Sequence, residues 1–502
     1  MSGGARTRRR TKGLLRGVPI STYTDSIGDA FRSLGEYASD LVAPTVRLGV
    51  TGLARSGKTV FITALVHNLI AAARLPFFDA AAEGRLARAY LEPQPDDVVP
   101  RFDYEAHLAD LTASPPCWPK STRRISQLRL TLEYASRKFW KRQLGRERLY
   151  IDIVDYPGEW LLDLPLLSID YAAWSRTAVE QAGASERKKA SKEWRKALAE
   201  VDPAGPADEA LAGKLSNLFK AYLIEARSDQ HALSTLPPGR FLMPGELEGS
   251  PALTFAPLTS DEAASFSRGS LWRLMERRFE AYKTHVVRPF FRDHFARLDR
   301  QIVLIDVLAA LNGGAEAVSD LERAMTEILE CFRTGANSLW SSLFAPRIDR
   351  IVLAATKADH LHHESHDRLE AILARLTGRA MARAEFAGAE VKVLALAAVR
   401  ATREGVARRN GEKLPCIVGY PLPGETIGKR TFDGNEEFAI FPGDLPKDPA
   451  LALKGWQTEH GEMRFVRFRP PNPVPLPSGG FAPFPNIRLD RAIQALIGDR
   501  LA

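Results

Sequence analysis

The chain has 502 residues, which is enough for a core with large insertions or for two or three domains. Its three cysteines, Cys117, Cys331 and Cys416, lie far apart, which argues against a disulfide framework and a zinc ribbon and fits a reducing, cytoplasmic setting. The 69 basic and 61 acidic residues leave a net charge of +8, too mild an excess to signal a nucleic-acid-binding protein, and no apolar run is long enough to span a membrane.

The first 43 residues combine a basic arm, Arg6–Lys12, with an amphipathic segment. Such an arm is most simply a solvated tail, and peripheral contact with anionic lipid is left open beside it. Ile27, Phe31 and Leu34 recur at helical spacing and predict a helix over residues 22–42.

The segment that follows has the pattern of a strand, a phosphate loop and a helix. An apolar run reaches Val50, Gly52–Thr59 fits G-x-x-x-x-G-K-[ST], and residues 60–73 continue with helical periodicity. In this pattern the glycines let backbone N–H groups face a phosphate at a helix N-terminus, Lys58 reaches the β- and γ-phosphates, and Thr59 ligates Mg²⁺. The predicted phosphate-binding residues are Gly52, Ala54, Arg55, Ser56, Gly57, Lys58, Thr59 and Val60.

After Pro76 the sequence predicts a long proline-containing loop with one helix around residues 82–91. Alternating apolar residues then predict strands over 125–134 and 148–155, which we expect to be antiparallel neighbours. Asp155–Gly158 directly follows the second strand and fits D-x-x-G. There Asp155 could hold Mg²⁺ through water, and the Gly158 N–H could bind a γ-phosphate.

Two details of this region stay open at the level of the sequence. Glu159 stands where many small GTPases have a glutamine that orients water, so it is either an unusual base or faces away from the phosphate. Thr122 is the candidate for a further Mg²⁺ ligand, and the adjacent Arg123 or Arg124 is a candidate arginine finger, with surface charge as the simpler interpretation.

Residues 160–300 change to mixed charge with helical periodicity, which predicts a domain-sized helical insertion. A buried strand returns at 301–307. Ser319–Glu322 then has the form of a capping box and predicts a helix that begins there and runs toward Leu343.

A further buried strand, residues 350–355, leads directly into Thr356–Asp359, which fits [NT]-K-x-D. A carboxylate at Asp359 could accept two hydrogen bonds from the N1–H and N2–H₂ edge of guanine, donors that adenine does not present together. Thr356 and Lys357 complete this element, and Ala398 and Val399 follow the next strand, 391–397, where a loop would pack against the base.

Four histidines, His360, His362, His363 and His366, crowd the turn after this element. His362 and His366 could face one side of a helix and hold a metal ion, although a solvated helix start explains the cluster equally well and is the favoured interpretation.

Beyond Thr402 the chain is rich in glycine and proline with short apolar runs, and it ends in a predicted helix over 489–501. The order of elements predicts an α/β P-loop NTPase with a Ras-like or Gα-like GTPase core that carries a helical insertion and a C-terminal loop- and β-rich insertion. The predicted segments are a basic arm and helix (1–43), the first part of the core (44–160), the helical insertion (161–299), the second part of the core (300–402), the loop- and β-rich insertion (403–488) and a closing helix (489–502).

Nearly the whole chain also resembles the YcjX-like family of P-loop stress proteins. The resemblance rests on Gly52–Thr63, Asp155–Leu166, Ile305–Leu308, Thr356–Leu361 and Phe484–Ala492. It implies a GTP-binding protein with a Ras-like or Gα-like core. It also implies a link to bacterial envelope stress and to an inner-membrane protein partner.

The sequence therefore predicts a cytoplasmic GTPase that binds GTP or GDP with Mg²⁺, hydrolyses GTP slowly and acts as a nucleotide-dependent switch. Its predicted catalytic residues are Lys58, Glu159 and Arg123, and its predicted metal ligands are Thr59, Thr122 and Asp155. The alternatives are a nucleotide-binding scaffold with negligible turnover, which the absence of glutamine at position 159 favours, and an ATP-dependent P-loop protein.

Overall fold

The computed structural model describes residues 43–53, 55–120, 124–138, 145–184, 187–227, 237–259, 266–330, 348–386, 388–409, 412–454 and 465–502. The predicted basic arm and the helix predicted over 22–42 lie outside these ranges. Residues from Thr45 to Ala502 form one compact unit, which is the unit described below.

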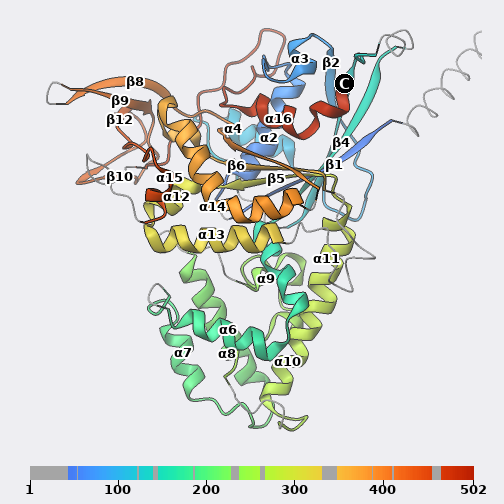
Figure 1. The fold of residues 1–502 in the computed structure, drawn as a ribbon, viewed down its shortest axis with the longest axis vertical. Helices are drawn as coiled ribbons and strands as arrows, with labels where there is room; N and C mark the ends of the chain where they lie inside the picture. Colours follow the sequence, from blue (N-terminus) through green and yellow to red (C-terminus); the bar gives the residue numbers. More distant parts are fainter. Residues whose placement is uncertain are drawn as a thin grey trace, which may run out of the picture. The chain divides into compact units, whose positions relative to one another are not determined.

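A seven-stranded sheet with the order β2-β3-β4-β1-β5-β6-β7 lies at the centre of this unit (Figure 1). The strands β4, β1, β5, β6 and β7 are parallel, whereas β3 runs antiparallel to both of its neighbours. Their bounds are β1 Thr45–Gly52, β2 Leu86–Glu92, β3 Ser126–Tyr134, β4 Glu147–Asp155, β5 Arg300–Ile305, β6 Arg350–Ala355 and β7 Glu390–Ala395. The α/β class and the strands predicted at these positions are confirmed, including the antiparallel pair β3 and β4.

Both faces of the sheet are buried, as the continuous apolar runs of its parallel strands require. Along β5, Ile302 and Leu304 pack in a cluster with α2 (Lys58–Ile70) and α16 (Leu489–Ile497). The alternate residues Val303 and Ile305 belong to a second cluster with α13 (Ala315–Glu330) and α14 (His366–Phe386). Figure 1 shows these two pairs of helices on opposite sides of the sheet.

The helix predicted around residues 82–91 is wrong. Only Asp79–Ala82 is helical there, as α3, and Leu86–Glu92 forms the edge strand β2. The reason is pairing with a strand distant in sequence: β2 lies antiparallel to β3, and Arg88 donates two hydrogen bonds to the Glu133 carboxylate at 2.8 Å each. Such cross-strand partners stabilise an edge strand in a segment whose local pattern favours a helix.

The predicted capping box at Ser319–Glu322 is also wrong, because α13 begins four residues earlier, at Ala315. Gly314, with φ +88°, precedes this start. Asp320, the sixth residue of the helix, is buried and accepts a hydrogen bond from Arg187 at 2.7 Å. The segment around Ser319 therefore lies inside the helix and packs on the helical insertion. The predicted continuation toward Leu343 lies outside the described residues.

The region after β4 is helical, as predicted, and packs on the α13 and α14 side of the sheet (Figure 1). Its main helices are α6 Tyr171–Ala182, α7 Lys192–Ala199, α8 Glu209–Ala226, α9 Gly239–Leu242, α10 Leu271–Tyr282 and α11 Arg288–Asp293. Aromatic rings fill its core; Trp174 stacks on Phe279 at 4.9 Å and Trp194 on Tyr222 at 5.8 Å, measured between ring centroids.

The buried carboxylate of Asp163 ties the start of this insertion to its later helices. It accepts hydrogen bonds from the backbone N–H groups of Gly239, at 2.7 Å, and Arg240, at 3.3 Å, and from the Tyr282 hydroxyl. Burial raises the pKa of Asp163 to about 6, and these hydrogen bonds counteract part of the rise.

The C-terminal part contains a three-stranded antiparallel sheet, as the loop- and β-rich prediction required. It consists of β8 (Arg403–Arg409), β9 (Glu412–Gly419) and β12 (Phe438–Ile440), with a small hairpin of β10 (Thr426–Ile427) and β11 (Arg430–Thr431) beside it. The chain then returns to the central sheet: Asn68 of α2 both donates to the Phe484 carbonyl, at 3.1 Å, and accepts from its N–H, at 2.8 Å. The predicted division of the chain at residues 160, 299, 402 and 488 stays a prediction.

The remaining helices are α4 Tyr104–Thr112, α12 Val307–Asn312 and α15 Pro449–Ala452.

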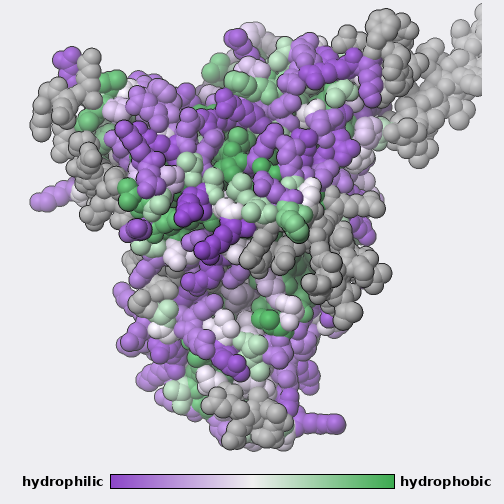
Figure 2. Space-filling view, in the orientation of Figure 1, coloured by the Kyte–Doolittle hydropathy of each residue, from purple (hydrophilic) through white to green (hydrophobic). Residues whose placement is uncertain are grey.

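On the face shown in Figure 2, the described surface is mostly hydrophilic, with hydrophobic side chains gathered in scattered patches. Among the described residues, no helix combines the length and the apolar character that a membrane crossing needs.

Candidate functional site

A cavity of about 950 Å³ opens beyond the carboxyl ends of the parallel strands, where ligands bind in open α/β sheets. Loops after β1, β4, β6 and β7 line it, although these segments are spread from Gly52 to Val399 in the sequence. The predicted residues on its wall are Gly52, Arg55, Ser56, Gly57, Lys58, Thr59, Val60, Glu159, Thr356, Lys357, Asp359, Ala398 and Val399.

Two glycines of the site, Gly52 and Gly158, stand where a side chain would not fit, and a third, Gly57, has a backbone conformation that favours glycine. A Cβ on Gly52 would lie 2.1 Å from Ser56 Oγ and 2.7 Å from the Leu304 carbonyl, and a Cβ on Gly158 would lie 2.6 Å from the Gly52 carbonyl. Gly57 has φ +85° at the start of α2, in the left-handed region that glycine tolerates. The D-x-x-G glycine therefore packs directly behind the phosphate loop, which couples the two motifs.

Two observations show that this loop fits an anionic group. The N-terminus of α2 has no side-chain cap, so its first N–H groups lack that hydrogen-bond acceptor, and the first residues of the helix line the cavity. The Ser56 hydroxyl is buried and has no hydrogen-bond partner among the described residues. A phosphate bound in the loop would supply acceptors to these donors.

Lys58 and Asp155 form an ion pair at the centre of the site. Their charged atoms are 2.5 Å apart, and their side chains are only 11% and 1% exposed. Thr59 is buried beside them in the first turn of α2. The pair places a cation and a carboxylate together at the end of β4, and Thr59 follows Lys58 in the chain; these are groups that a phosphate and Mg²⁺ need.

Glu159 lines the cavity and is 5% exposed. Its carboxylate lies 2.7 Å from the guanidinium of Arg227, which directly follows α8 of the helical insertion. The carboxylate is therefore paired with a cation that the sequence did not indicate.

The opposite end of the cavity is formed by Thr356–Asp359 and the loop after β7. Asp359 is 5% exposed, and its Oδ2 accepts a hydrogen bond from the Ala401 N–H at 2.9 Å. The Thr402 hydroxyl donates to the Asp359 carbonyl, and Lys357 pairs with Asp306 after β5. These contacts fix the carboxylate at the wall opposite the phosphate loop, beside Ala398 and Val399.

Three predicted site residues, Ala54, Thr122 and Arg123, lie outside the described residues. Arg124, the alternative candidate to Arg123, is exposed. The pairing of His362 with His366, which the sequence left open as the less favoured interpretation, is not formed: His366 is buried and its Nε2 donates to the Ala358 carbonyl at 2.9 Å.

Residues of both insertions line the cavity, and sequence reasoning missed all of them. They are Ile224, Arg227, Leu242 and Met243 from the helical insertion, and Leu422, Arg467 and Phe468 from the C-terminal part, with Trp118 beside them. No local motif marks them, because tertiary packing of the insertions brings them to the cavity.

Several cations lie together at the phosphate-loop end. Burial lowers the pKa of Arg55, and the nearby charges of Arg467 and Arg227 lower it further, whereas Asp306 raises it. The side chains of Lys58, Arg227 and Arg467 are each paired with a carboxylate, so a bound polyanion would compete with these carboxylates for the cations.

Comparison with known proteins agrees with this architecture. The model of the YcjX-like family, DUF463, matches residues 46–501. A protein of Escherichia coli (strain K12) called "Ras-like GTPase YcjX" is 38% identical over 467 residues, which cover 91% of this chain and 96% of the relative. A protein of the same name from Shewanella oneidensis is 34% identical over 474 residues, which cover 91% of this chain and 94% of the relative. The fold is that of a P-loop NTPase, and the chain belongs to the YcjX-like family.

Proposed function

We propose that this protein binds guanine nucleotide with Mg²⁺ and hydrolyses GTP. The observation that carries the proposal is one cavity whose wall combines the phosphate loop, Pro157 of D-x-x-G and residues of T-K-x-D, from segments around residues 52, 157 and 356. Two relatives named "Ras-like GTPase", which this chain matches over nearly their full length, support the same reaction.

In this proposal each end of the cavity has one task. Lys58 and the N–H groups of the phosphate loop neutralise and orient the phosphates, and Asp359 accepts the hydrogen bonds that distinguish guanine from adenine. Thr59 and Asp155, with Thr122 as a further candidate, would hold Mg²⁺. When bound, the ion neutralises charge that develops on the phosphates during transfer.

The rate should be slow. Glu159 occupies the position of a water-orienting glutamine, and its charge is already engaged by Arg227. A carboxylate held in this way is a poor base, so turnover would depend on a rearrangement of this pair or on an activating partner. Arg227 is then the described candidate for a cation in cis beside the phosphates, and Arg123 remains a second candidate.

The finer biological assignment combines three arguments. The family resemblance supports a nucleotide-dependent switch in a bacterial envelope stress response with an inner-membrane protein partner. The three separated cysteines support a cytoplasmic setting, and the basic arm supports peripheral membrane contact.

The first test is to measure GTP and ATP affinity of the purified protein with Mg²⁺ and to follow phosphate release in the same samples. Tight GTP binding with slow phosphate release is the expected result. Binding without release would favour the alternative of a nucleotide-binding scaffold. A preference for ATP would overturn the role of Thr356–Asp359 and favour an ATP-dependent protein.

A further inference from the structure

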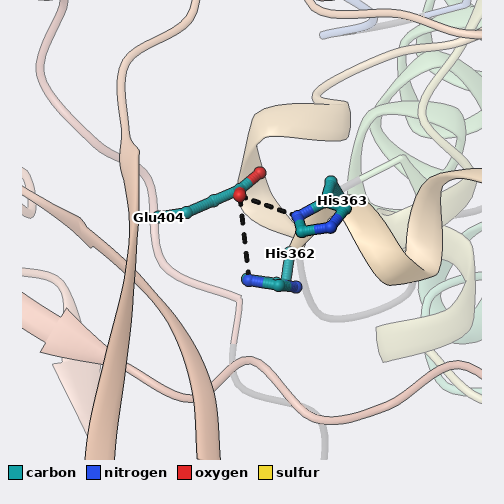
Figure 3. A group of neighbouring side chains, drawn as sticks. All are labelled: His362, His363 and Glu404. Carbon is teal, nitrogen blue, oxygen red and sulfur yellow. Dashed lines mark hydrogen bonds and ion pairs between the residues drawn. The ribbon is translucent and has the colours of Figure 1, made fainter.

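A second group of potential metal ligands lies on the other side of the T-K-x-D loop. His362 and His363 belong to the turn between Asp359 and α14, and Glu404 is the second residue of β8. Figure 3 shows both imidazole rings directed at the same carboxylate oxygen. His363 Nδ1 lies 2.7 Å and His362 Nε2 lies 3.7 Å from Glu404 Oε2, and the three ligand atoms all lie within 4.8 Å of one another.

The environment of His362 indicates that a ligand is missing from this cluster. The side chain is 14% exposed, and its Nδ1 is buried and has no hydrogen-bond partner among the described residues. Its Nε2 is too far from Glu404 for a hydrogen bond at 3.7 Å. No described hydrogen bond engages this ring through Nδ1, and Nε2 faces the Glu404 carboxylate without bonding to it, so Nε2 has a lone pair available for a cation.

We propose that His362, His363 and Glu404 bind a divalent transition-metal ion, with Zn²⁺ as the first choice. Two imidazole nitrogens and one carboxylate oxygen are typical zinc ligands, and Mg²⁺ prefers oxygen ligands alone. Ligand atoms in tetrahedral zinc sites are about 3.3 Å apart, as follows from Zn–N distances of about 2.0–2.1 Å. The observed separations bracket that value, so shifts of side-chain rotamers are enough to close the site. The side chain of His363 is 62% exposed, which leaves the fourth position to water.

The carboxylate is held ready for one-oxygen ligation. Arg400 Nη2 lies 3.5 Å from Glu404 Oε1, the oxygen turned away from the histidines, and Arg400 Nε donates to the Thr402 carbonyl at 2.9 Å. The positive charge of this guanidinium repels a nearby cation, which lowers the affinity of the site for metal. It also fixes the carboxylate orientation, as partners of metal-bound carboxylates do.

The ion would join two parts of the chain that the cavity also needs. Asp359 precedes His362 by three residues, and Thr402 and Ala401, which bond to Asp359, precede Glu404 by two and three. The metal would thus brace the Asp359 loop against the start of the C-terminal insertion. The site itself does not depend on the proposed GTPase activity, because its ligands do not line the nucleotide cavity.

The test uses the full chain without a polyhistidine tag and without nucleotide. After removal of metal with a chelator, Zn²⁺ is titrated in competition with a chromophoric chelator, and Co²⁺ is added to separate samples to record the visible absorption of a tetrahedral site. We expect one zinc ion per chain and a rise in melting temperature on zinc addition. Mg²⁺ alone should not compete.

Three variants and one control decide the outcome. His362→Ala, His363→Gln and Glu404→Gln should each bind zinc at least about tenfold more weakly, and His285→Ala, which removes an exposed histidine elsewhere, should bind as wild type does. Since His363 is largely exposed, His363→Gln should fold normally, which melting in the absence of metal checks. The proposal is overturned if wild type binds no zinc or if any of the three variants keeps the affinity of His285→Ala.

Discussion

In the proposed function Asp359 selects guanine over other bases, and its hydrogen bonds allow this role to be tested by substitution. Its Oδ2 accepts a hydrogen bond from the Ala401 N–H, which an asparagine oxygen can also accept. Asp359→Asn should therefore fold normally, lose most of its affinity for GTP and gain affinity for xanthosine triphosphate, whose base presents the complementary edge. Nucleotide competition assays measure both affinities.

The control for this change is Asp367→Asn, which neutralises a carboxylate that is 86% exposed, eight residues along the chain. It should leave the preference for GTP as it is. If Asp359→Asn also keeps the preference for GTP over xanthosine triphosphate, Asp359 does not read the base.

Lys58 has two roles at once, since it pairs with a carboxylate that is 1% exposed. Lys58→Ala should weaken GTP binding and should also lower the free energy of unfolding by about 3–5 kcal/mol, because Asp155 is left buried without its cation. The double variant Lys58→Ala/Asp155→Asn should recover much of the stability and none of the nucleotide affinity. Urea denaturation and nucleotide titration separate the two effects. Nucleotide affinity equal to wild type in Lys58→Ala would show that the phosphate-loop assignment is wrong.

At the level of elements, the helical insertion depends on a buried carboxylate whose protonation favours folding. The pKa of Asp163 is about 6 in the folded chain, against an ordinary value of 3.8, so the folded state holds the proton more tightly than the unfolded state. The stability gained in this way is fully present below about pH 4 and is lost as the pH rises through about 6. The difference corresponds to about 3 kcal/mol.

Asp163→Asn should remove this pH dependence of the free energy of unfolding, because an amide does not titrate. It should also change that free energy by an amount that is the same at every pH. The free energy of unfolding of wild type, relative to the variant, should fall by up to about 3 kcal/mol between pH 4 and pH 7. Glu180→Gln, an exposed change on α6, is the control and should follow wild type. Parallel curves for Asp163→Asn and wild type would show that Asp163 does not titrate in this range.

The elements that sequence predicts well are those whose signal is local. The strand before Gly52, the glycines of the phosphate loop, and the strand ends that carry Asp155 and Asp359 each have their pattern within about a dozen residues. The edge strand β2 and the start of α13 depend on partners far away, such as Glu133 for Arg88 and Arg187 for Asp320. Local propensity does not contain those partners, so both elements were mispredicted.

For the molecule as a whole, the same distinction applies to the cavity. Its motif residues were visible in the sequence, but Arg227, Arg467 and Phe468 reach it only through the packing of two insertions. The convergence of His362 and His363 on Glu404 likewise joins a turn and a strand about forty residues apart, whereas helical spacing suggested His366 as the partner. Sequence patterns therefore located the ligand-binding loops and not the walls that close around them.

Arg227 links the helical insertion to the nucleotide-binding core through its ion pair with Glu159. Removing it in Arg227→Ala leaves Glu159 charged and almost fully buried beside the proposed γ-phosphate position. We expect GTP affinity to fall by more than GDP affinity, because the uncompensated carboxylate repels the additional phosphate most strongly. Glu159→Gln in the same chain should restore GTP affinity, since the repelling charge is gone.

The phosphate-release rate then separates two functions of this arginine. If Arg227 only neutralises Glu159, the double variant should hydrolyse GTP as the single variant Glu159→Gln does at saturating nucleotide. If it also stabilises the transition state in cis, the double variant should bind GTP well and release phosphate at least about tenfold more slowly than Glu159→Gln. Arg176→Ala, an exposed change on α6, controls for loss of a positive charge from the insertion and should alter neither quantity. Unchanged GTP affinity and turnover in Arg227→Ala would mean that the insertion contacts the cavity without influencing it.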